Sequence, residues 1–136
     1  MPMGHRLWPW RRSDQALSRQ ALGRRSEALA VRHLAAQGYT IERTHVRCRA
    51  GEIDVVAKEG DVLCFVEVRS TTSDAWGGPL ATITAAKRRR LMCAAEWYLA
   101  RRGSPAPACR FDVVAVSWAS AQPDIQVLRG AFDASR

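Results

Sequence analysis

Three acidic residues stand in two strongly apolar segments, and their types and spacing suggest metal-dependent chemistry. Glu52 and Asp54 lie in GEIDVVA, and Glu67 lies in VLCFVEVRS, where the other residues are mostly valine, isoleucine, leucine and phenylalanine. A buried carboxylate is unfavourable unless hydrogen bonds or a cation compensate it. The position of these acids therefore needs a structural explanation.

A tight turn between the two segments predicts that two of the acids face each other. The loop Gly60-Asp61 has glycine first, which favours a type II′ turn between antiparallel strands. Glu59 then pairs with Val62, and the register continues outward until Asp54 faces Glu67. A four-residue loop keeps this pairing, whereas a three-residue loop turns the two acids to opposite faces.

Opposed carboxylates in a hairpin must be compensated, because directly facing side chains have β-carbons about 4.5 to 5.5 Å apart and like charges there are destabilising. Arg69 follows Glu67 by two residues and therefore shares its face. One solution is a structural ion cluster. The other is a hard divalent cation such as Mg²⁺, which takes carboxylate oxygens and completes its shell with water and phosphate. The spacing D-x(12)-E-x-R, read with the hairpin register, favours the cation.

A helix before the hairpin brings a further acid towards the core. The periodicity predicts a helix over about 21–37, with Gly38 as its end and an apolar stripe of Ala30, Val31, Leu34 and Ala35. Glu27 is in line with Val31 and Leu34, because residues four and seven apart share a helix face. We expect Glu27 on or beside the core-facing side.

The remaining elements complete an α/β fold with a mixed β-sheet flanked by helices, in the order α-β-β-β-α-β-β. Thr84 caps a second helix that ends at Gly103. Its apolar face is Leu91, Ala94, Ala95, Tyr98 and Leu99. The predicted strands are 39–46, 53–57, 62–70, 111–118 and 125–128. Residues 1–20 are predicted to be a flexible basic N-terminal arm, and residues 21–136 a single domain.

The charge balance points to a polyanionic partner. Twenty-one Lys and Arg residues against thirteen Asp and Glu residues give a net charge of +8 and a pI near 10.3. Nucleic acid is the obvious candidate, although a basic balance also occurs in small proteins that merely avoid aggregation. Lys87, Arg88 and Arg89 stand at a predicted helix N-terminus, which favours anions, so we interpret them as phosphate-binding residues rather than a solvated charge run. The loop residues Gly77-Gly78-Pro79 are either a close-approach segment for a nucleic-acid strand or an ordinary turn.

Other classes of protein are not supported. No apolar run is long enough for a membrane span, and the N-terminus lacks a secretory signal, so we expect a soluble, cytoplasmic protein. The four cysteines form no C-x-x-C pair, which predicts reduced, mostly packed thiols instead of a zinc site or disulfides. The three histidines have no metal or triad spacing, and no P-loop or Gly-x-Ser-x-Gly signature occurs. Asp112 is interpreted as structural, capping or pairing with Arg110.

These motifs resemble a known nuclease superfamily. GEIDVVAKEGDVLCFVEVRS is similar to the central motif of the PD-(D/E)XK, or restriction-endonuclease-like, proteins. The resemblance is closer to one bacterial branch, the YraN-like proteins, which are similar in fold to Holliday junction resolvases. It runs from about residue 23 to 132 and includes EALAVRHLAAQGY, FVEVR, GGP, TAAKRRRL and RFDVVAV.

The resemblance implies a restriction-endonuclease-like core and roles for particular residues. Asp54 and Glu67 would bind Mg²⁺ or Mn²⁺, Glu27 would be the acid carried by a helix, and Glu52 an additional acid beside the site. Arg69 stands where the family pattern usually has lysine. Arginine keeps a positive charge towards a phosphate, but it is always protonated, so it cannot share a proton with the attacking water.

Two functions from different classes follow. The first is a metal-dependent endonuclease that cleaves phosphodiester bonds in DNA, with branched DNA as a candidate substrate. Arg69 and Lys87 would contact the phosphate, and Glu27 would orient the attacking water. The alternative is a non-catalytic nucleic-acid-binding protein with the same fold, which Arg69 favours. A protein-interaction adaptor is a third class. A homodimer is an expectation from fold analogy alone.

Overall fold

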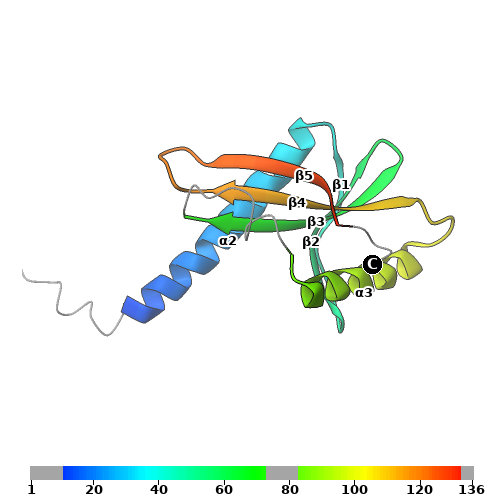
Figure 1. Cartoon of the computed structure of the whole chain (residues 1–136), viewed down its shortest axis with the longest axis horizontal. Coiled ribbons are helices and arrows are strands. Elements are labelled where there is room, and N and C mark those ends of the chain that lie inside the picture. Colours follow the sequence, from blue (N-terminus) through cyan, green and yellow to red (C-terminus); the bar gives the residue numbers. More distant parts are fainter. Residues whose placement is uncertain (1–10, 73–82, 133–136) are drawn as a thin grey trace, which may run out of the picture.

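The structure, a computed structural model, describes the backbone of residues 11–72 and 83–132 and the side chains from residue 18 onward within these ranges. Two helices and five strands make up the described chain, and their order is the predicted α-β-β-β-α-β-β (Figure 1). The helices are α2 (Arg11–Ala36) and α3 (Ala85–Arg102). The strands are β1 (Thr40–Cys48), β2 (Gly51–Glu59), β3 (Val62–Thr71), β4 (Ala108–Ser117) and β5 (Asp124–Phe132).

The five strands form one mixed sheet in the spatial order β1-β2-β3-β4-β5. β3 and β4 are parallel, and the other neighbouring pairs are antiparallel. The parallel pair requires a crossover connection, which contains α3. The predicted mixed sheet with flanking helices is therefore confirmed.

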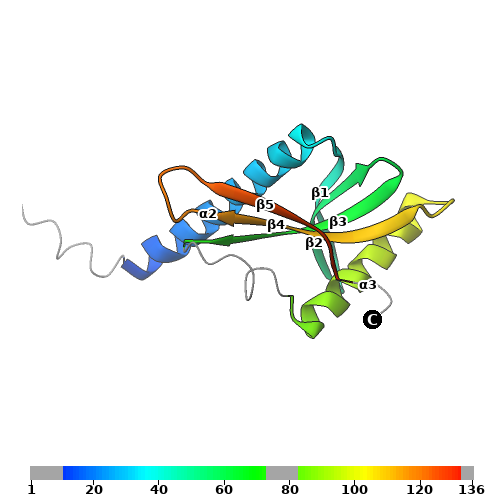
Figure 2. The same ribbon diagram turned by 45° about the horizontal axis from the view of Figure 1, so that its top comes forward.

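The two helices cover opposite faces of the sheet, as Figures 1 and 2 show from two directions. Alternate residues of β3 divide between the faces: Leu63 and Phe65 pack in one buried cluster with α3, and Cys64 and Val66 in a second cluster with α2. Two apolar cores thus lie on either side of β3, which explains why its sequence is apolar at nearly every position. Glu67 continues the α3-facing row of β3.

The helix α2 begins earlier than the periodicity predicted. It starts at Arg11 and not near residue 21, so residues 11–20 of the expected arm are helical. Residues 1–10 lie outside the described residues, and a basic arm there stays a prediction. The end of the helix is as predicted, since Gly38 follows it with a φ of +99°. Ala30 and Leu34 are buried, whereas Ala35 is exposed and was wrongly placed in the apolar stripe.

The second helix closely follows its prediction. The Thr84 side chain accepts a hydrogen bond from the backbone N–H of Lys87 at 3.1 Å, and Gly103 ends the helix. Leu91, Ala94 and Ala95 are buried in the α3-facing core, with Tyr98 and Leu99 packed at its edge. The Gly77-Gly78-Pro79 loop before this helix lies outside the described residues.

The hairpin turn has the predicted length and register. Glu59 pairs with Val62, and Ala57 pairs with Cys64. Gly60 has a φ of +60° while Asp61 has no positive φ, which agrees with a type II′ turn. The paired residues continue to Val55 and Val66, so Asp54 and Glu67 are next in the same register.

A buried ion network lies on the α2-facing side of the sheet, where Asp112 of β4 pairs with Val66 of β3. Asp112 is 1% exposed and accepts hydrogen bonds from the Arg110 guanidinium at 2.8 and 2.9 Å and from the Tyr39 hydroxyl at 2.9 Å. Arg110 also bonds Glu59 at 2.6 Å. The structural interpretation of Asp112 as a partner of Arg110 is confirmed.

The cysteines are all free thiols, as predicted. Their packing was only partly right, because Cys64 is buried but Cys93 and Cys109 are exposed. Neither helix in the described part of the chain is long and apolar enough to cross a membrane.

Candidate nuclease-like site

A kink in the β1–β2 hairpin sets the position of Asp54. Ile53 pairs with Val46, and Val55 pairs with Thr44. Regular alternation would place Ile53 and Val55 on the same face. Instead, Ile53 packs in the α3-facing core and Val55 in the α2-facing core.

The kink coincides with an unusual backbone conformation on the partner strand. His45, which lies between the two pairs on β1, has a φ of +56°, the only positive φ of a non-glycine residue in the described chain. Histidine enters this left-handed region more readily than most residues, but it is still uncommon. Asp54 therefore lies between a residue that packs on the α3 side and one that packs on the α2 side. It interacts electrostatically with Glu27 of α2 and with Lys87 of α3.

Asp54 and Glu67 meet beyond the last paired residues of β2 and β3. The Asp54 carboxylate accepts a hydrogen bond from the backbone N–H of Val68 at 2.8 Å. Glu67 Oε2 lies 3.4 Å from Lys87 Nζ on α3, and the Glu67 side chain is only 11% exposed. The helix and the hairpin thus bring a lysine and two carboxylates together.

The two carboxylates are electrostatically coupled. Burial, followed by the negative charge of Asp54, raises the pKa of Glu67 to about 7, although Lys87 opposes this shift. Burial also raises the pKa of Asp54, against the hydrogen bond from Val68 and the charge of Lys87. A hydrogen bond with Glu67 also lowers the pKa of Asp54. Adjacent buried acids with shifted pKa values are a common feature of sites that bind cations or transfer protons.

Glu27 approaches the same acids from α2. Burial, and after it the charge of Asp54, raises the pKa of Glu27. Its Oε1 lies 3.2 Å from His45 Nε2, whose positive form lowers the pKa in return. A pocket of about 450 Å³ is lined by residues that include Glu27, His45 and Asp54. The helix acid expected from sequence is therefore beside Asp54.

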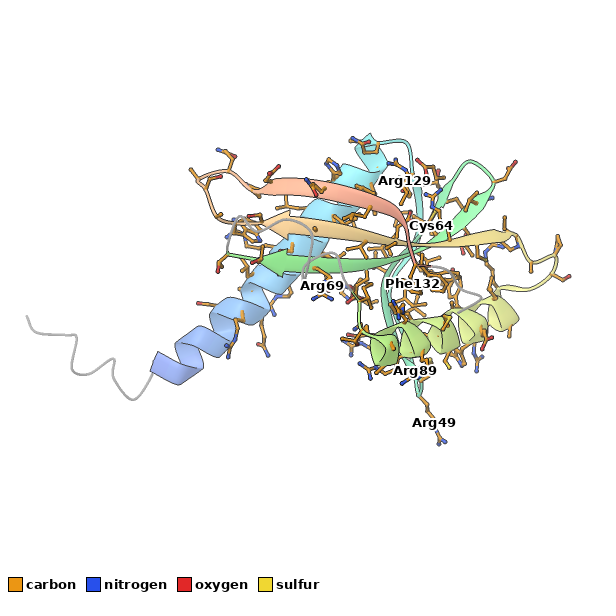
Figure 3. The ribbon with its side chains drawn as sticks, viewed as in Figure 1. Arg49, Cys64, Arg69, Arg89, Arg129 and Phe132 are labelled. Carbon is orange, nitrogen blue, oxygen red and sulfur yellow. The ribbon has the colours of Figure 1, made fainter. Side chains whose placement is uncertain are left out.

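A second groove of about 640 Å³ opens on the α3 side of the acids. Its charged lining is Glu67, Arg69, Lys87 and Arg90. The positive charge of Arg69 lowers the pKa of Glu67, which places this side chain in the field of the site. Figure 3 shows Arg69 on β3, facing the space above the first turns of α3.

The cationic residues predicted on α3 do not all lie in this groove. Lys87 does, whereas Arg88 is half-buried, Arg89 is exposed, and neither is among the residues that line it. Arg90 takes a place in the lining that the sequence interpretation did not assign. Glu52 is exposed and paired with Arg47 at 3.3 Å, and its charge raises the pKa of both Glu27 and Asp54. It is beside the site, as expected.

The donors available suit a cation that keeps much of its water. Within residues 11–72 and 83–132, no three His, Cys, Asp or Glu side chains form a ready metal cage. Mg²⁺ is usually held by only one or two carboxylates together with water and phosphate oxygens. Asp54 and Glu67 are two adjacent carboxylates with elevated pKa values, and a divalent charge would relieve their repulsion. The donor set fits such an ion.

Sequence reasoning missed His45. Its contact with Glu27 depends on a backbone kink and on the packing of α2 against the hairpin, and neither leaves a spacing signal. The spacing of the three histidines to one another gives no signal. The contact of His45 is with the carboxylate of Glu27, which is 18 residues away in sequence. The one available hint was its position beside the strand that carries the acids.

Comparisons with known proteins agree with the geometry on fold but name no activity. The model of the uncharacterised protein family UPF0102 matches residues 26–116, a range that contains every predicted site residue. The chain is 47% identical over 115 residues to a UPF0102 protein of Anaeromyxobacter dehalogenans (strain 2CP-C), covering 85% of this chain and 86% of that protein. It is 44% identical over 126 residues to a UPF0102 protein of Pseudomonas paraeruginosa, covering 90% and 99%.

Proposed function

The chain belongs to the UPF0102 family, the YraN-like branch of the restriction-endonuclease-like superfamily, and from the geometry of its site we propose that it is a metal-dependent endonuclease acting on DNA. Branched DNA is the first substrate to test. The proposal concerns cleavage of a phosphodiester bond at the acids of the β2–β3 hairpin, with Mg²⁺ or Mn²⁺ as cofactor.

The observation that carries the proposal is the meeting of Asp54, Glu67 and Lys87. Two carboxylates lie next to each other just beyond the last paired residues of the β2–β3 hairpin, and a lysine from α3 stands 3.4 Å from one of them. A purely structural cluster would pair each acid with a cation. Here Asp54 accepts a hydrogen bond from the backbone N–H of Val68, and burial raises its pKa although the charge of Lys87 opposes the shift.

The protein residues have separable roles in the proposed reaction. Asp54 and Glu67 would hold the metal ion. When bound, the ion would stabilise charge on the phosphoryl oxygens and acidify water. Arg69 and Lys87 line the groove on the α3 side and would bind the scissile phosphate. Glu27 would accept a hydrogen bond from the attacking water, and His45 would orient its carboxylate.

Lys87 also supplies the type of cation that the family motif usually carries at position 69. Its ammonium comes from the helix opposite and reaches Glu67 Oε2. An ammonium can give up a proton when it is desolvated, whereas the guanidinium of Arg69 cannot. The departure at Arg69 therefore does not leave the site without a lysine.

A non-catalytic nucleic-acid-binding protein is the second candidate, and the arginine at position 69 is the observation that favours it. Binding requires only the positive surface, including Arg69, Arg88, Arg89 and Arg90. Cleavage requires the acids as well.

Cleavage of labelled DNA separates the two candidates. The full chain is incubated with a four-way junction, a single strand and a duplex of matched sequence, in Mg²⁺, in Mn²⁺ and in EDTA. We expect metal-dependent cleavage that Asp54→Asn and Glu67→Gln each abolish. Asp61→Asn changes an exposed aspartate in the β2–β3 turn, at the other end of the hairpin, and is the control, with unchanged activity expected.

The outcomes that count against the enzyme are specific. If the wild-type chain binds DNA but cuts no form of DNA or RNA in either metal, the non-catalytic binding protein is the better supported function. Cleavage that survives both substitutions points to a contaminant or to a different site. If the chain binds no nucleic acid at all, both candidates are wrong.

A further inference from the structure

A groove separate from the two described above runs between β1 and the C-terminal half of α3. It has a volume of about 520 Å³, within the range of small-molecule sites. Tyr98 and Arg102 of α3, which line the groove, both bond Glu42 of β1. The tyrosine hydroxyl donates to one carboxylate oxygen, and the guanidinium donates two hydrogen bonds of 2.8 and 3.1 Å. These bonds hold α3 against β1 along the groove.

Trp97 lines this groove with an exposed aromatic surface. At 36% exposure it is the only large hydrophobic side chain in the described part of the chain that is classed as exposed. The guanidinium of Arg101 lies 4.5 Å from the centre of the indole ring. A ring with a guanidinium beside it is a platform on which a nucleobase can stack, because every base has a π-face and Arg adds a cation–π contribution.

The lining of the groove is strongly positive. Four arginines and one glutamate line it, and the glutamate is neutralised by Arg102. Arg43 and Arg101 are exposed, so their guanidinium groups are accessible to phosphates. Arginines interleaved with an aromatic side chain are the combination expected where a protein follows a single nucleic-acid strand.

The groove and the pocket of Glu27 and Asp54 share two residues of the edge strand β1. Thr44 and His45 line both, although Trp97 comes from α3 and Glu27 from α2, which cover opposite faces of the sheet. A single strand that crosses β1 at Thr44 and His45 would therefore contact both the groove and the pocket.

We propose that the groove of Arg43, Trp97 and Arg101 binds an unpaired nucleotide of a single-stranded segment and leads that strand to Glu27 and Asp54. The inference rests on the proposed nucleic-acid function and deepens it by naming the substrate form. Base stacking on Trp97 needs a base that is not already stacked in a duplex. The substrate is therefore a single strand, or a structure with unpaired nucleotides next to the cleaved bond.

The test is a binding measurement in EDTA, so that it does not depend on catalysis. Fluorescein-labelled single strands of DNA and of RNA, and a blunt DNA duplex of the same sequence, are titrated with the full chain. We expect Trp97→Ala to weaken single-strand binding about tenfold or more, with less than a twofold change for the duplex. Trp97→Phe keeps a stacking ring and should restore most of the affinity. Cys93→Ala, an exposed neutral change on the same helix, is the control.

A second readout reports the contact directly. A single strand that carries 5-iodouracil is photocrosslinked to the wild-type chain, and the attached peptide is identified by mass spectrometry. Attachment at Trp97 or Tyr98 supports the groove even if Trp97→Ala should fail to fold. Attachment confined to other surfaces overturns the inference, as do equal losses for single strand and duplex in a folded Trp97→Ala chain.

Failure of this inference can be told apart from failure of the proposed function. If Trp97→Ala binds single strands as tightly as wild type, the groove is not the binding site, and the proposal of metal-dependent cleavage is unaffected. If single-strand binding requires Trp97 but the chain never cleaves, the groove is supported and the proposed endonuclease activity is wrong. A chain that binds neither form overturns both.

Discussion

Asp54 accepts a hydrogen bond from the backbone N–H of Val68, at 2.8 Å, just beyond Val55 and Val66, where the pairing of β2 and β3 ends. The carboxylate thus joins the two strands where they cease to pair through their backbones. The bond also favours the ionised form of Asp54 beside Glu67, against the effect of burial.

Metal binding should be visible as stabilisation that depends on Asp54. Mn²⁺ at a hundredfold excess over its dissociation constant should stabilise the wild-type chain by about 2.7 kcal/mol, and Asp54→Asn should abolish the shift. Thermal melts with and without metal measure this. Asp61→Asn should keep the wild-type shift.

The same variant, melted in EDTA, distinguishes a metal site from a structural ion cluster. The asparagine amide oxygen can still accept the Val68 hydrogen bond, and the repulsion of Glu67 is removed. We expect Asp54→Asn to be as stable as wild type or more stable without metal. A clearly lower melting temperature in EDTA would instead identify Asp54 as a member of a stabilising cluster.

Substitutions of Arg69 should show whether its role is electrostatic. If Arg69 stabilises charge on the phosphate, Arg69→Lys should retain or raise cleavage, while Arg69→Ala should lower it about a hundredfold. Single-turnover rates on the best DNA substrate measure the effect. Equal activity in the alanine form would assign the phosphate contact to Lys87 and Arg90 instead.

Arg88 and Arg89 should contribute to DNA affinity through phosphates and not through base edges. Their joint replacement by glutamine should weaken binding to every sequence and reduce the slope of log affinity against log salt by about 2. Arg129→Gln is the control, because Arg129 lies on the edge strand β5, away from α3 (Figure 3). An unchanged slope in the double variant would move the footprint elsewhere, with the N-terminal segment next in line.

The stability of the chain should fall in acid partly through Glu59. Hydrogen bonds from Arg129 and then Arg110 lower the pKa of Glu59 from 4.5 to about 2. Because the folded pKa lies below the unfolded one, this contribution is complete above about pH 4.5 and is lost as the pH falls towards 2. Glu59→Gln should therefore lower the melting temperature at pH 7 but not at pH 2.

Melting temperatures between pH 7 and 2 check this prediction. Glu96→Gln, at an exposed position on α3, should run parallel to wild type. A constant gap between Glu59→Gln and wild type over the whole range would show that the glutamate acts by packing and not by its charge.

The sequence predicted most of the sheet and the β2–β3 register that leads towards Asp54 and Glu67 because the signals for them are local. A glycine-first turn and alternating apolar residues set the β2–β3 register, and Thr84 and Gly103 bounded α3. The start of α2 was missed because residues 11–20 have little apolar periodicity. The link between His45 and Glu27 could not be found, because it depends on tertiary packing.

The groove lined by Trp97 illustrates the same limit. Trp97 and Arg101 are one helical turn apart, so their contact could be predicted from spacing alone. Their position opposite Arg43 could not, because it requires the way in which α3 lies against β1. The local sequence pattern thus predicted where the acids lie on the hairpin. The residues around them depend on how two helices pack against the hairpin, which local pattern does not reveal.

The divided anchoring of the β1–β2 hairpin also protects the site against slippage. A shift of one residue along the sheet would require Ile53 and Val55 to leave two separate cores at once. The position of Asp54 is therefore held by the packing of its immediate neighbours in addition to the turn between β2 and β3. A slipped hairpin would lose apolar packing on both faces of the sheet, and not on one face alone.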